Sequence, residues 1–448
     1  MTTQILPERI DVTHPYAEAH RAFEEGAGAS APASVQSMRA AALERFRTIG
    51  FPTTKNEDWH FTSVAPIVEH DYVLVSTPSG DVRPEQLAPF TFGARDWHTI
   101  VFVNGRFDAQ LSSLDALPEG VRVLDLQSAW REAPDLTEQL GQITSYDDRA
   151  FSALNTAFMH DGAVVHVSKE TEVEQPIHLL FVSDANAAKS ITHPRNPVVV
   201  ERQAKATVLE SYVALTDATY VTNAVTEVAI AEGATLHHYK MQREGMRAFH
   251  VGTIDAHQAR DSHYVSFSFA TGASLSRTNI YTTLDGTGCG ATLNALYMLD
   301  GEQHCDHQTL IVHAQPNCYS RQLYKGVLDA RSHGVFNGKV YVFPEAQKTD
   351  GKQTNNTLLL SDKAQIDTKP QLEIFADDVK CTHGATVGRL DEMALFYMKS
   401  RGVSRELARR LLTYAFAADV LETIERPEVR EGLERISLER FVKVGEAG

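Results

Sequence analysis

Short apolar runs separated by turn residues fill the middle of the chain. Between about residues 96 and 380 these runs are rich in β-branched and aromatic residues, with Gly, Asn and Asp between them. This texture predicts an all-β unit of many short strands, because helical periodicity is nearly absent apart from one short piece near Phe151–Met159. The predicted strands are Thr99–Val103, Ala163–Val167, Ile177–Val182, Pro197–Val200, Val225–Ile230, Tyr264–Phe269 and Leu293–Leu299.

Glycines recur within this segment at intervals that favour a coiled arrangement of the strands. Gly233, Gly252, Gly272 and Gly290 follow one another at nearly equal intervals, each at or near a turn that precedes an apolar run. One turn in about 20 residues is typical of a solenoid or β-helix. A sandwich more often shows turns every ~8–12 residues. The spacing therefore predicts a β-helix, with a double-sheet sandwich as the alternative.

Three regions follow from the pattern. Residues 1–95 are predicted to be a helical and loop-like N-terminal region, residues 96–388 the β-helix core, and residues 389–448 a C-terminal helical domain. A typical domain has about 150 residues, so a chain of 448 residues agrees with roughly three units.

The N-terminal region contains one well-marked helix and an aromatic loop. Ser34–Ile49 carries apolar residues at spacings of three and four, with Ser34 as the expected N-cap and Gly50 as the stop. We expect Trp59 and Phe61, in the polar loop that follows, to pin this loop against the next domain.

The C-terminal region predicts three helices. Asp391 is expected to cap the first, which ends at Gly402, and Ser404 the second, which runs to about Ile424; the third follows Pro427. Such helices could cover one end of the solenoid or dock a partner, and the pattern does not separate the two roles. The second helix carries an apolar stripe of Leu407, Leu411, Tyr414, Ala415 and Ala418.

Composition indicates which partners the chain is not expected to bind and in which compartment we expect it. A formal net charge of −16 without a compensating Lys/Arg block argues against nucleic acid. Because the apolar runs are far shorter than the ~18 residues of a membrane helix and the first residues lack signal-peptide character, we expect a cytoplasmic protein without membrane contact. Four cysteines without a Cys-x-x-Cys are expected to be reduced thiols, and Cys289 and Cys318, both at predicted turns, are expected to be structural.

A cysteine and a histidine stand two positions apart just before the C-terminal helices. Cys381 and His383 would project side by side, because side chains alternate along an extended segment. Sulfur beside imidazole suits iron, zinc or copper, and it also suits a reactive thiolate. Two ligands complete none of these sites, so any further ligands must come from elsewhere in the chain or from another protein.

Cys305, His307 and His313 form a second concentration of ligand types. On a strand these three share one face, and His304 and Asp306 share the other. Three nitrogen and sulfur ligands on one face resemble half of a transition-metal site, although their spacing matches no standard zinc signature. A purely structural role is the alternative.

Two adjacent carboxylates, Asp377 and Asp378, raise the alternative of a β-helix enzyme that acts on carbohydrates. Neighbouring residues on a strand point to opposite faces, so this pair could not easily flank one substrate. The chain also has no Gly-x-Ser-x-Gly, phosphate-binding loop or His-Glu-x-x-His.

Several of these segments resemble one known family, the SufB/SufD iron–sulfur cluster assembly proteins. The resemblance covers most of the chain from residue 150 to 425, and it is closest to the SufD branch because of the Lys55–Thr62 motif, the modest length and the lack of extra cysteines. The similar segments are Lys55–Thr62, His333–Val342, Thr349–Asp362, Asp377–Gly388 and Ala394–Gly402.

The resemblance implies a right-handed parallel β-helix core between helical ends, and a subunit without catalysis of its own. It implies a SufB-like paralogue as heterodimer partner and a SufC-like ABC ATPase bound through the C-terminal helices, with Leu407, Leu411, Tyr414 and Ala418 in the docking stripe. His383 would hold iron or a nascent cluster transiently together with a SufB cysteine, with Cys381 beside it and no cofactor permanently bound. A SufB-like scaffold that carries the cluster itself is the alternative, and homodimer formation without SufB is left open.

Overall fold

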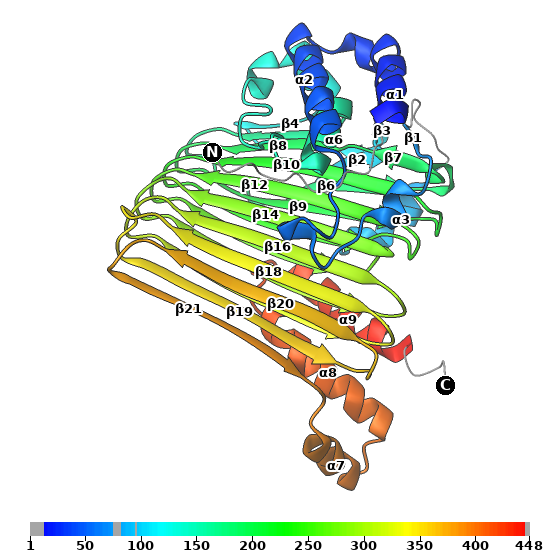
Figure 1. Ribbon diagram of the computed structural model, residues 1–448, viewed down its shortest axis with the longest axis vertical. Helices are drawn as coiled ribbons and strands as arrows, with labels where there is room; N and C mark the ends of the chain where they lie inside the picture. The colour runs from blue at the N-terminus through cyan, green and yellow to red at the C-terminus, as the bar shows by residue number, and fades with distance from the viewer. Residues whose placement is uncertain (1–12, 75–81, 95, 444–448) are drawn as a thin grey trace.

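The computed structural model describes residues 13–74, 82–94 and 96–443, and it is built around a parallel β-solenoid (Figure 1). Two sheets face one another, and the chain alternates between them as it coils. All seven predicted strands and the predicted short helix are present, so the mainly β class with a β-helix core is confirmed and the sandwich alternative is wrong.

The first sheet consists mainly of parallel strands. These end at β20, and β4 pairs antiparallel with β5 at the other edge. In spatial order the strands are β20 (Gln365–Ile374), β18 (His333–Val342), β16 (His304–His313), β14 (Leu275–Leu284), β12 (Phe249–Gln258), β10 (Val221–Ile230), β8 (Arg195–Val200), β5 (Ala163–Val167) and β4 (Val121–Asp125); β7 (Ser190–Thr192) also pairs with β10, and β1 (Val73–Leu74) pairs with β7.

The second sheet also consists mainly of parallel strands. It ends at β21 on one side and at the antiparallel hairpin β2–β3 on the other. In spatial order the strands are β21 (Val379–Gly388), β19 (Thr349–Leu359), β17 (Tyr319–Leu328), β15 (Gly290–Leu299), β13 (His263–Ala270), β11 (Thr235–Arg243), β9 (Lys205–Ala214), β6 (Ile177–Ser183), β2 (His98–Val103) and β3 (Arg106–Ser113).

One coil is longer than the glycine spacing predicts. Val221 pairs with Phe249, and His304 pairs with His333, so each of these pairs marks the start of one coil and the start of the next. Each coil contains two strands, one in each sheet, and two turns. Gly252 lies inside β12 rather than at a turn, so the glycine interval is not the repeat of the fold.

Helices and antiparallel strands close the N-terminal end of the solenoid (Figure 1). Helix α2 (Ala33–Ile49) packs against α6 (Ala150–Phe158), and Gly50, at φ 66°, ends α2 through its N–H bond to the Phe46 carbonyl. The predicted N-cap Ser34 is wrong, because Pro32 occupies that position without a side-chain bond. The other helices of this region are α1 (Thr13–Glu25), α3 (Ala65–Val68), α4 (Pro84–Leu87) and α5 (Leu126–Glu132), and α5 was missed by the periodicity.

The last two helices of the described chain lie against the side of the solenoid. Asp391 caps α7 (Glu392–Ser400) and Ser404 caps α8 (Arg405–Leu421), as predicted, and α9 (Pro427–Lys443) follows. The buried face of α8 packs against β15 and β17 of the second sheet. These helices therefore do not cover the end of the solenoid, and the predicted role of covering it is excluded. None of the described helices is long and apolar enough to cross a membrane.

Candidate functional site at the open end of the solenoid

The last coil of the solenoid is uncovered. Every residue of β20 and β21 is half-buried or exposed, whereas the central strands are buried on nearly all positions. Both strands are the outer members of their sheets, so within the described residues each presents one row of backbone groups without a strand beside it. The open end is therefore a pair of sheet edges, each ten residues long.

Cys381 and His383 lie on this last strand and on the same side of it. They pair with Gly351 and Gln353 of β19, whose positions are buried inside the coil. The two ligand candidates therefore continue the inward-facing row of the solenoid at the point where the coil stops. The predicted side-by-side projection is confirmed, and His383 is exposed at a surface rather than enclosed.

The environment of Cys381 keeps its sulfur protonated. Burial raises the pKa of the thiol and the Asp350 carboxylate raises it further, while the backbone N–H of Gly351 acts in the opposite direction. A metal ion would have to displace this proton on binding. Within the described residues, no group of three or more His, Cys, Asp or Glu side chains could hold a metal ion. The open end thus supplies part of a coordination sphere at most.

Exposed apolar side chains accompany the ligand candidates at this end. Phe375, just after β20, is 57% exposed, and its ring lies 5.3 Å from that of Tyr341. Val387 of β21 is 50% exposed. Apolar groups beside unpaired strand edges are typical of a surface that another protein covers.

The second predicted ligand set is not brought together. Cys305, His307 and His313 share the inward face of β16 as predicted, and Cys305 Sγ lies 3.7 Å from His307 Nδ1. His313 stands at the far end of the strand, roughly 20 Å away at ~3.3 Å per residue, and bonds Ser320 Oγ instead. Burial lowers the pKa of both His307 and His313 to about 4, so both imidazoles are neutral at pH 7.

The N-terminal loop is pinned to the first sheet. The ring of Trp59 stacks on Phe151 at 5.4 Å, and the guanidinium of Arg277 lies 3.7 Å from its centre. The Thr62 hydroxyl donates to Asp306 at 2.6 Å. The predicted anchoring by Trp59 is confirmed, and the role of Arg277 was missed because its partners in the loop lie far away in the sequence.

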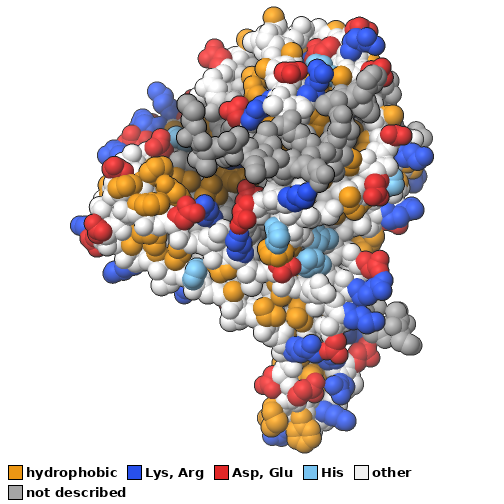
Figure 2. Space-filling model, viewed as in Figure 1, with side chains coloured by type: hydrophobic (Ala, Val, Ile, Leu, Met, Phe, Trp, Pro, Cys, Tyr) orange, Lys and Arg blue, Asp and Glu red, His pale blue; other side chains and the backbone are white. Residues whose placement is uncertain are grey.

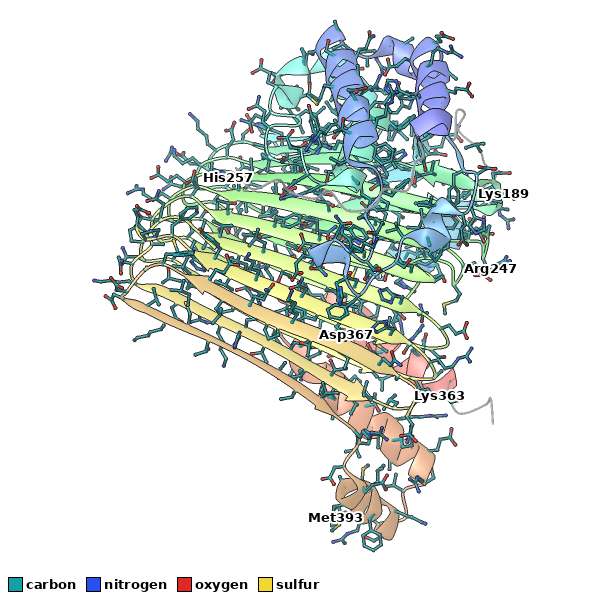
Figure 3. All side chains as sticks on the ribbon, in the orientation of Figure 1. Lys189, Arg247, His257, Lys363, Asp367 and Met393 are labelled. Carbon is teal, nitrogen blue, oxygen red and sulfur yellow. The ribbon has the colours of Figure 1, made fainter. Side chains whose placement is uncertain are left out.

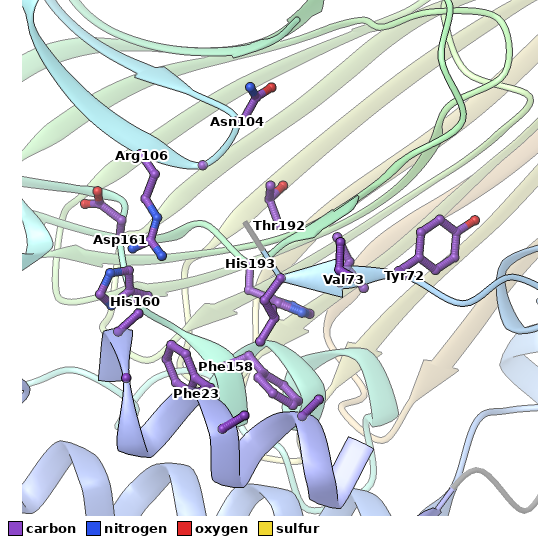
Figure 4. A pocket seen from close by; sticks show the side chains of 17 residues that line it. Phe23, Tyr72, Val73, Asn104, Arg106, Phe158, His160, Asp161, Thr192 and His193 are labelled. Carbon is purple, nitrogen blue, oxygen red and sulfur yellow. The ribbon is translucent and has the colours of Figure 1, made fainter. Parts of the chain in front are cut away.

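A cavity of about 350 Å³ lies among residues of α1, α6, β1 and β7 at the closed end of the solenoid (Figure 4). Phe23 and Phe158 form its apolar side, and Arg106 and Asp161 are on its polar side. Burial raises the pKa of Asp161 to about 7, against hydrogen bonds from the Phe107 and Gly162 N–H groups. Its position separates this cavity from Cys381 and His383.

The C-terminal helices expose several large apolar side chains. Leu407 and Leu411 of α8 are 46% and 41% exposed, and the buried side of the helix is formed by other residues, among them Ala417 and Val420. Tyr414 and Ala418 of the predicted stripe are half-buried, so they lie at its margin. Helix α7 stands away from the solenoid (Figures 2 and 3), with Met393, Phe396 and Tyr397 largely exposed.

Comparisons with known proteins agree with this architecture. The family model described as "SUF system FeS cluster assembly, SufBD core domain" matches residues 181–416, and "SufBD protein N-terminal region" matches residues 11–179. The chain is 32% identical to the iron–sulfur cluster assembly protein SufD of Escherichia coli over 424 residues, covering 94% of this chain and 95% of that protein.

Two further relatives give the same result. A SufBD family protein of Synechocystis is 36% identical over 397 residues, covering 87% of each chain. SufD of Bacillus subtilis is 29% identical over 430 residues, covering 92% of this chain and 95% of that protein. A solenoid with these matches defines the class as iron–sulfur cluster assembly proteins of the SUF system. The chain belongs to the SufBD family of that system, and it is similar to SufD. This membership argues against the carbohydrate enzyme.

Proposed function

We propose that this chain is a SufD-type subunit whose open end meets a SufB-like paralogue, and that a nascent iron–sulfur cluster is built where the two meet. The observation that carries the proposal is the position of Cys381 and His383 on the last strand of an uncovered coil. An exposed sheet edge is a template for pairing with another strand. A partner solenoid that docks there would cover the edges and the apolar side chains together.

The chemistry of the open end fits a shared site. The His383 imidazole is a good ligand for iron, and the Cys381 thiol becomes one after losing its proton. Because the described chain supplies no third ligand nearby, the partner's residues would complete the coordination. Iron and the cluster are then cargo held transiently between subunits, and no permanently bound cofactor is needed.

The second part of the proposal concerns the C-terminal helices. The apolar face made by Leu407 and Leu411 is exposed on α8, while the opposite face holds the helix to the solenoid. An amphipathic helix anchored in this way can present its outer face to a partner. We assign that partner as a SufC-like ATPase, so that ATP hydrolysis belongs to the partner and this chain has no catalysis of its own. A cytoplasmic location remains part of the proposal.

The cluster site is tested in the complex. His383→Ala and Cys381→Ser chains are co-expressed with SufB-like and SufC-like subunits, and iron and acid-labile sulfide are measured in the purified complex. Thr382→Ala is the matched control, because Thr382 projects to the other face of β21. We expect every variant complex to keep its subunit composition. We expect iron and sulfide to decrease most in the His383 variant. Full iron and sulfide in that variant would contradict the proposal.

The docking face is tested separately. Leu407→Glu with Leu411→Glu is expected to abolish ATPase binding in a pull-down while the circular dichroism spectrum stays the same. Arg405→Glu adds negative charge to the same helix off the apolar face, and it should leave binding intact. Unchanged binding in the double variant would reject this docking surface. A chain that holds a stable cluster alone after anaerobic reconstitution would favour the SufB-like scaffold instead.

A further inference from the structure

Two buried cysteines occupy matching positions in consecutive coils. Cys289 directly precedes β15, Cys318 directly precedes β17, and the first residues of these strands, Gly290 and Tyr319, are register partners. The Tyr319 N–H donates to the Cys289 carbonyl at 3.0 Å, so the ladder continues to the cysteines. Partner positions on neighbouring strands are ~4.8 Å apart, and this separation falls within the Cα distances that a disulfide spans.

The two cysteines belong to the same hydrophobic core cluster, and each sulfur also contacts backbone carbonyl oxygens. The neighbouring Cys318 side chain is the main reason that the pKa of Cys289 is lowered to about 6, against the effect of burial. Cys289 in turn, together with burial, raises the pKa of Cys318. Each thiol also has a carbonyl to which it donates when protonated, Ala259 at 2.9 Å for Cys289 and Gly286 at 3.2 Å for Cys318. A thiolate next to a protonated thiol is poised for oxidation and for thiol–disulfide chemistry.

The pair lies directly beneath the surface. Cys289 and Cys318 are 0% and 2% exposed, but Thr287, Asn317 and Tyr319 around them are exposed. Local opening of these turns would expose the sulfur atoms to a small uncharged oxidant more readily than to a bulky thiol reagent.

We propose that Cys289 and Cys318 form a peroxide-sensitive site that closes to a disulfide between consecutive coils. The Cys289 thiolate attacks one oxygen of hydrogen peroxide, an S–O bond forms, the O–O bond breaks, and the departing hydroxide takes a proton to become water. Cys318 then loses its proton and attacks the sulfenic sulfur, an S–S bond forms, the S–O bond breaks, and a second water leaves. Two thiols and one peroxide thus give one disulfide and two waters.

The two coils that the disulfide would join also contact a C-terminal helix. Strands β15 and β17 are the ones on which α8 packs, and Lys325 of β17 bonds both Asp419 and the Phe416 carbonyl of that helix. The disulfide would therefore covalently link the two coils that seat the C-terminal helices.

A third buried thiol supplies an internal control. Cys305 is 1% exposed, like the pair, but its sulfur lies beside His307 rather than beside another cysteine. Burial raises the pKa of Cys305 to about 12, so its thiolate is scarce at neutral pH. If burial alone controlled oxidation, all three thiols would react with peroxide alike. If pairing controls it, Cys289 and Cys318 react and Cys305 does not.

The experiment uses the full chain, reduced and then treated with graded hydrogen peroxide at pH 7.5. After the peroxide is destroyed, free thiols are blocked with iodoacetamide in denaturant, disulfides are reduced, and the released thiols are labelled with N-ethylmaleimide for peptide mass spectrometry. We expect maleimide on Cys289 and Cys318 in equal amounts, iodoacetamide on Cys305, and an intact mass lower by two hydrogens before reduction. Maleimide on neither member of the pair, or sulfinic acid in place of a disulfide, would overturn the proposal.

Variants separate the chemistry from the fold. In Cys318→Ser the resolving thiol is gone, so Cys289 should accumulate a sulfenic acid that dimedone captures, with no intrachain disulfide. Cys305→Ser should oxidise like the natural chain. If Cys318→Ser does not fold, the labelling of the natural chain still decides the question. Equal dimedone capture at Cys289 and Cys305 in the folded chain would overturn the proposal.

Discussion

The buried histidine His178 predicts a specific loss of stability in acid. Its ring is 0% exposed, packs edge-on against Trp97 with centroids 5.8 Å apart, and places Nε2 2.8 Å from Ser211 Oγ. Burial lowers its pKa to about 3. Because the unfolded chain binds the proton near the ordinary pKa of about 6.5 and the native chain does not, the free energy of unfolding falls as pH drops below that value.

The magnitude follows from this difference in proton binding. A pH of 5.0 lies ~1.5 units below the pKa of this histidine in the unfolded chain, so protonation of the unfolded chain lowers the free energy of unfolding by about 2 kcal/mol. At pH 7.5 this site changes the free energy of unfolding by close to zero. Asp161 titrates in the same window with the opposite sign, since its raised pKa of about 7 means that the native state takes up the proton first. The comparison must therefore be made between two chains that both retain Asp161.

His178→Gln provides that comparison, because the amide can still meet Ser211 and never gains a proton. Urea unfolding is followed by Trp fluorescence at pH 7.5 and 5.0 for both chains. We expect the destabilisation caused by the substitution at pH 7.5 to shrink by about 2 kcal/mol at pH 5.0. His257→Gln, which removes an exposed imidazole, is the matched control. A difference between the two chains that does not change with pH, or an equal change in the control, would refute the reasoning.

Three further substitutions, one of them with a glycine control, test contacts that hold the N-terminal part of the chain together. Glu227→Ala removes the carboxylate that pairs with buried Arg195 and accepts three backbone N–H bonds, and urea unfolding should show a loss of about 3–5 kcal/mol; a loss below ~1 kcal/mol would mean that the pair is not essential. Gly162→Ala places Cβ 2.1 Å from the Arg195 carbonyl oxygen and should yield little folded protein on size exclusion, whereas Gly301→Ala, in open space at φ 61°, should cost only about 1 kcal/mol. Trp59→Ala should cost about 2–3 kcal/mol and speed hydrogen exchange in its loop; unchanged exchange there would contradict the anchoring.

The strands and caps show how far local sequence reaches. Ala163–Val167 is predicted and observed with the same bounds, and Asp391 and Ser404 cap their helices through their own side chains. Each of these features depends on contacts within a few residues. The predicted N-cap Ser34 is the exception. The helix begins earlier, at Ala33, because Pro32 is also compatible with the start of a helix.

The coil length and the ligand sets could not be obtained in the same way. The number of residues in one coil depends on which strands face each other across the core. Turns without glycine contribute to that number in the same way as turns with glycine. Cys381 and His383 share a face because they lie two positions apart on one strand. His313 also shares a face with Cys305, but the two lie eight positions apart on one strand, about 26 Å at ~3.3 Å per residue, and the prediction of a shared site considered the face and not this distance.

The sequence by itself determined the mainly β class, the helical ends, and a cysteine–histidine pair on one face just before the C-terminal helices. Only the tertiary structure showed that this pair lies on an uncovered coil and that α8 and α9 lie against the side of the solenoid. It also brought Cys289 and Cys318 together from consecutive coils. The reason is physical: alternation and capping act between near neighbours, whereas exposure of an edge and contact between coils depend on every strand that precedes them.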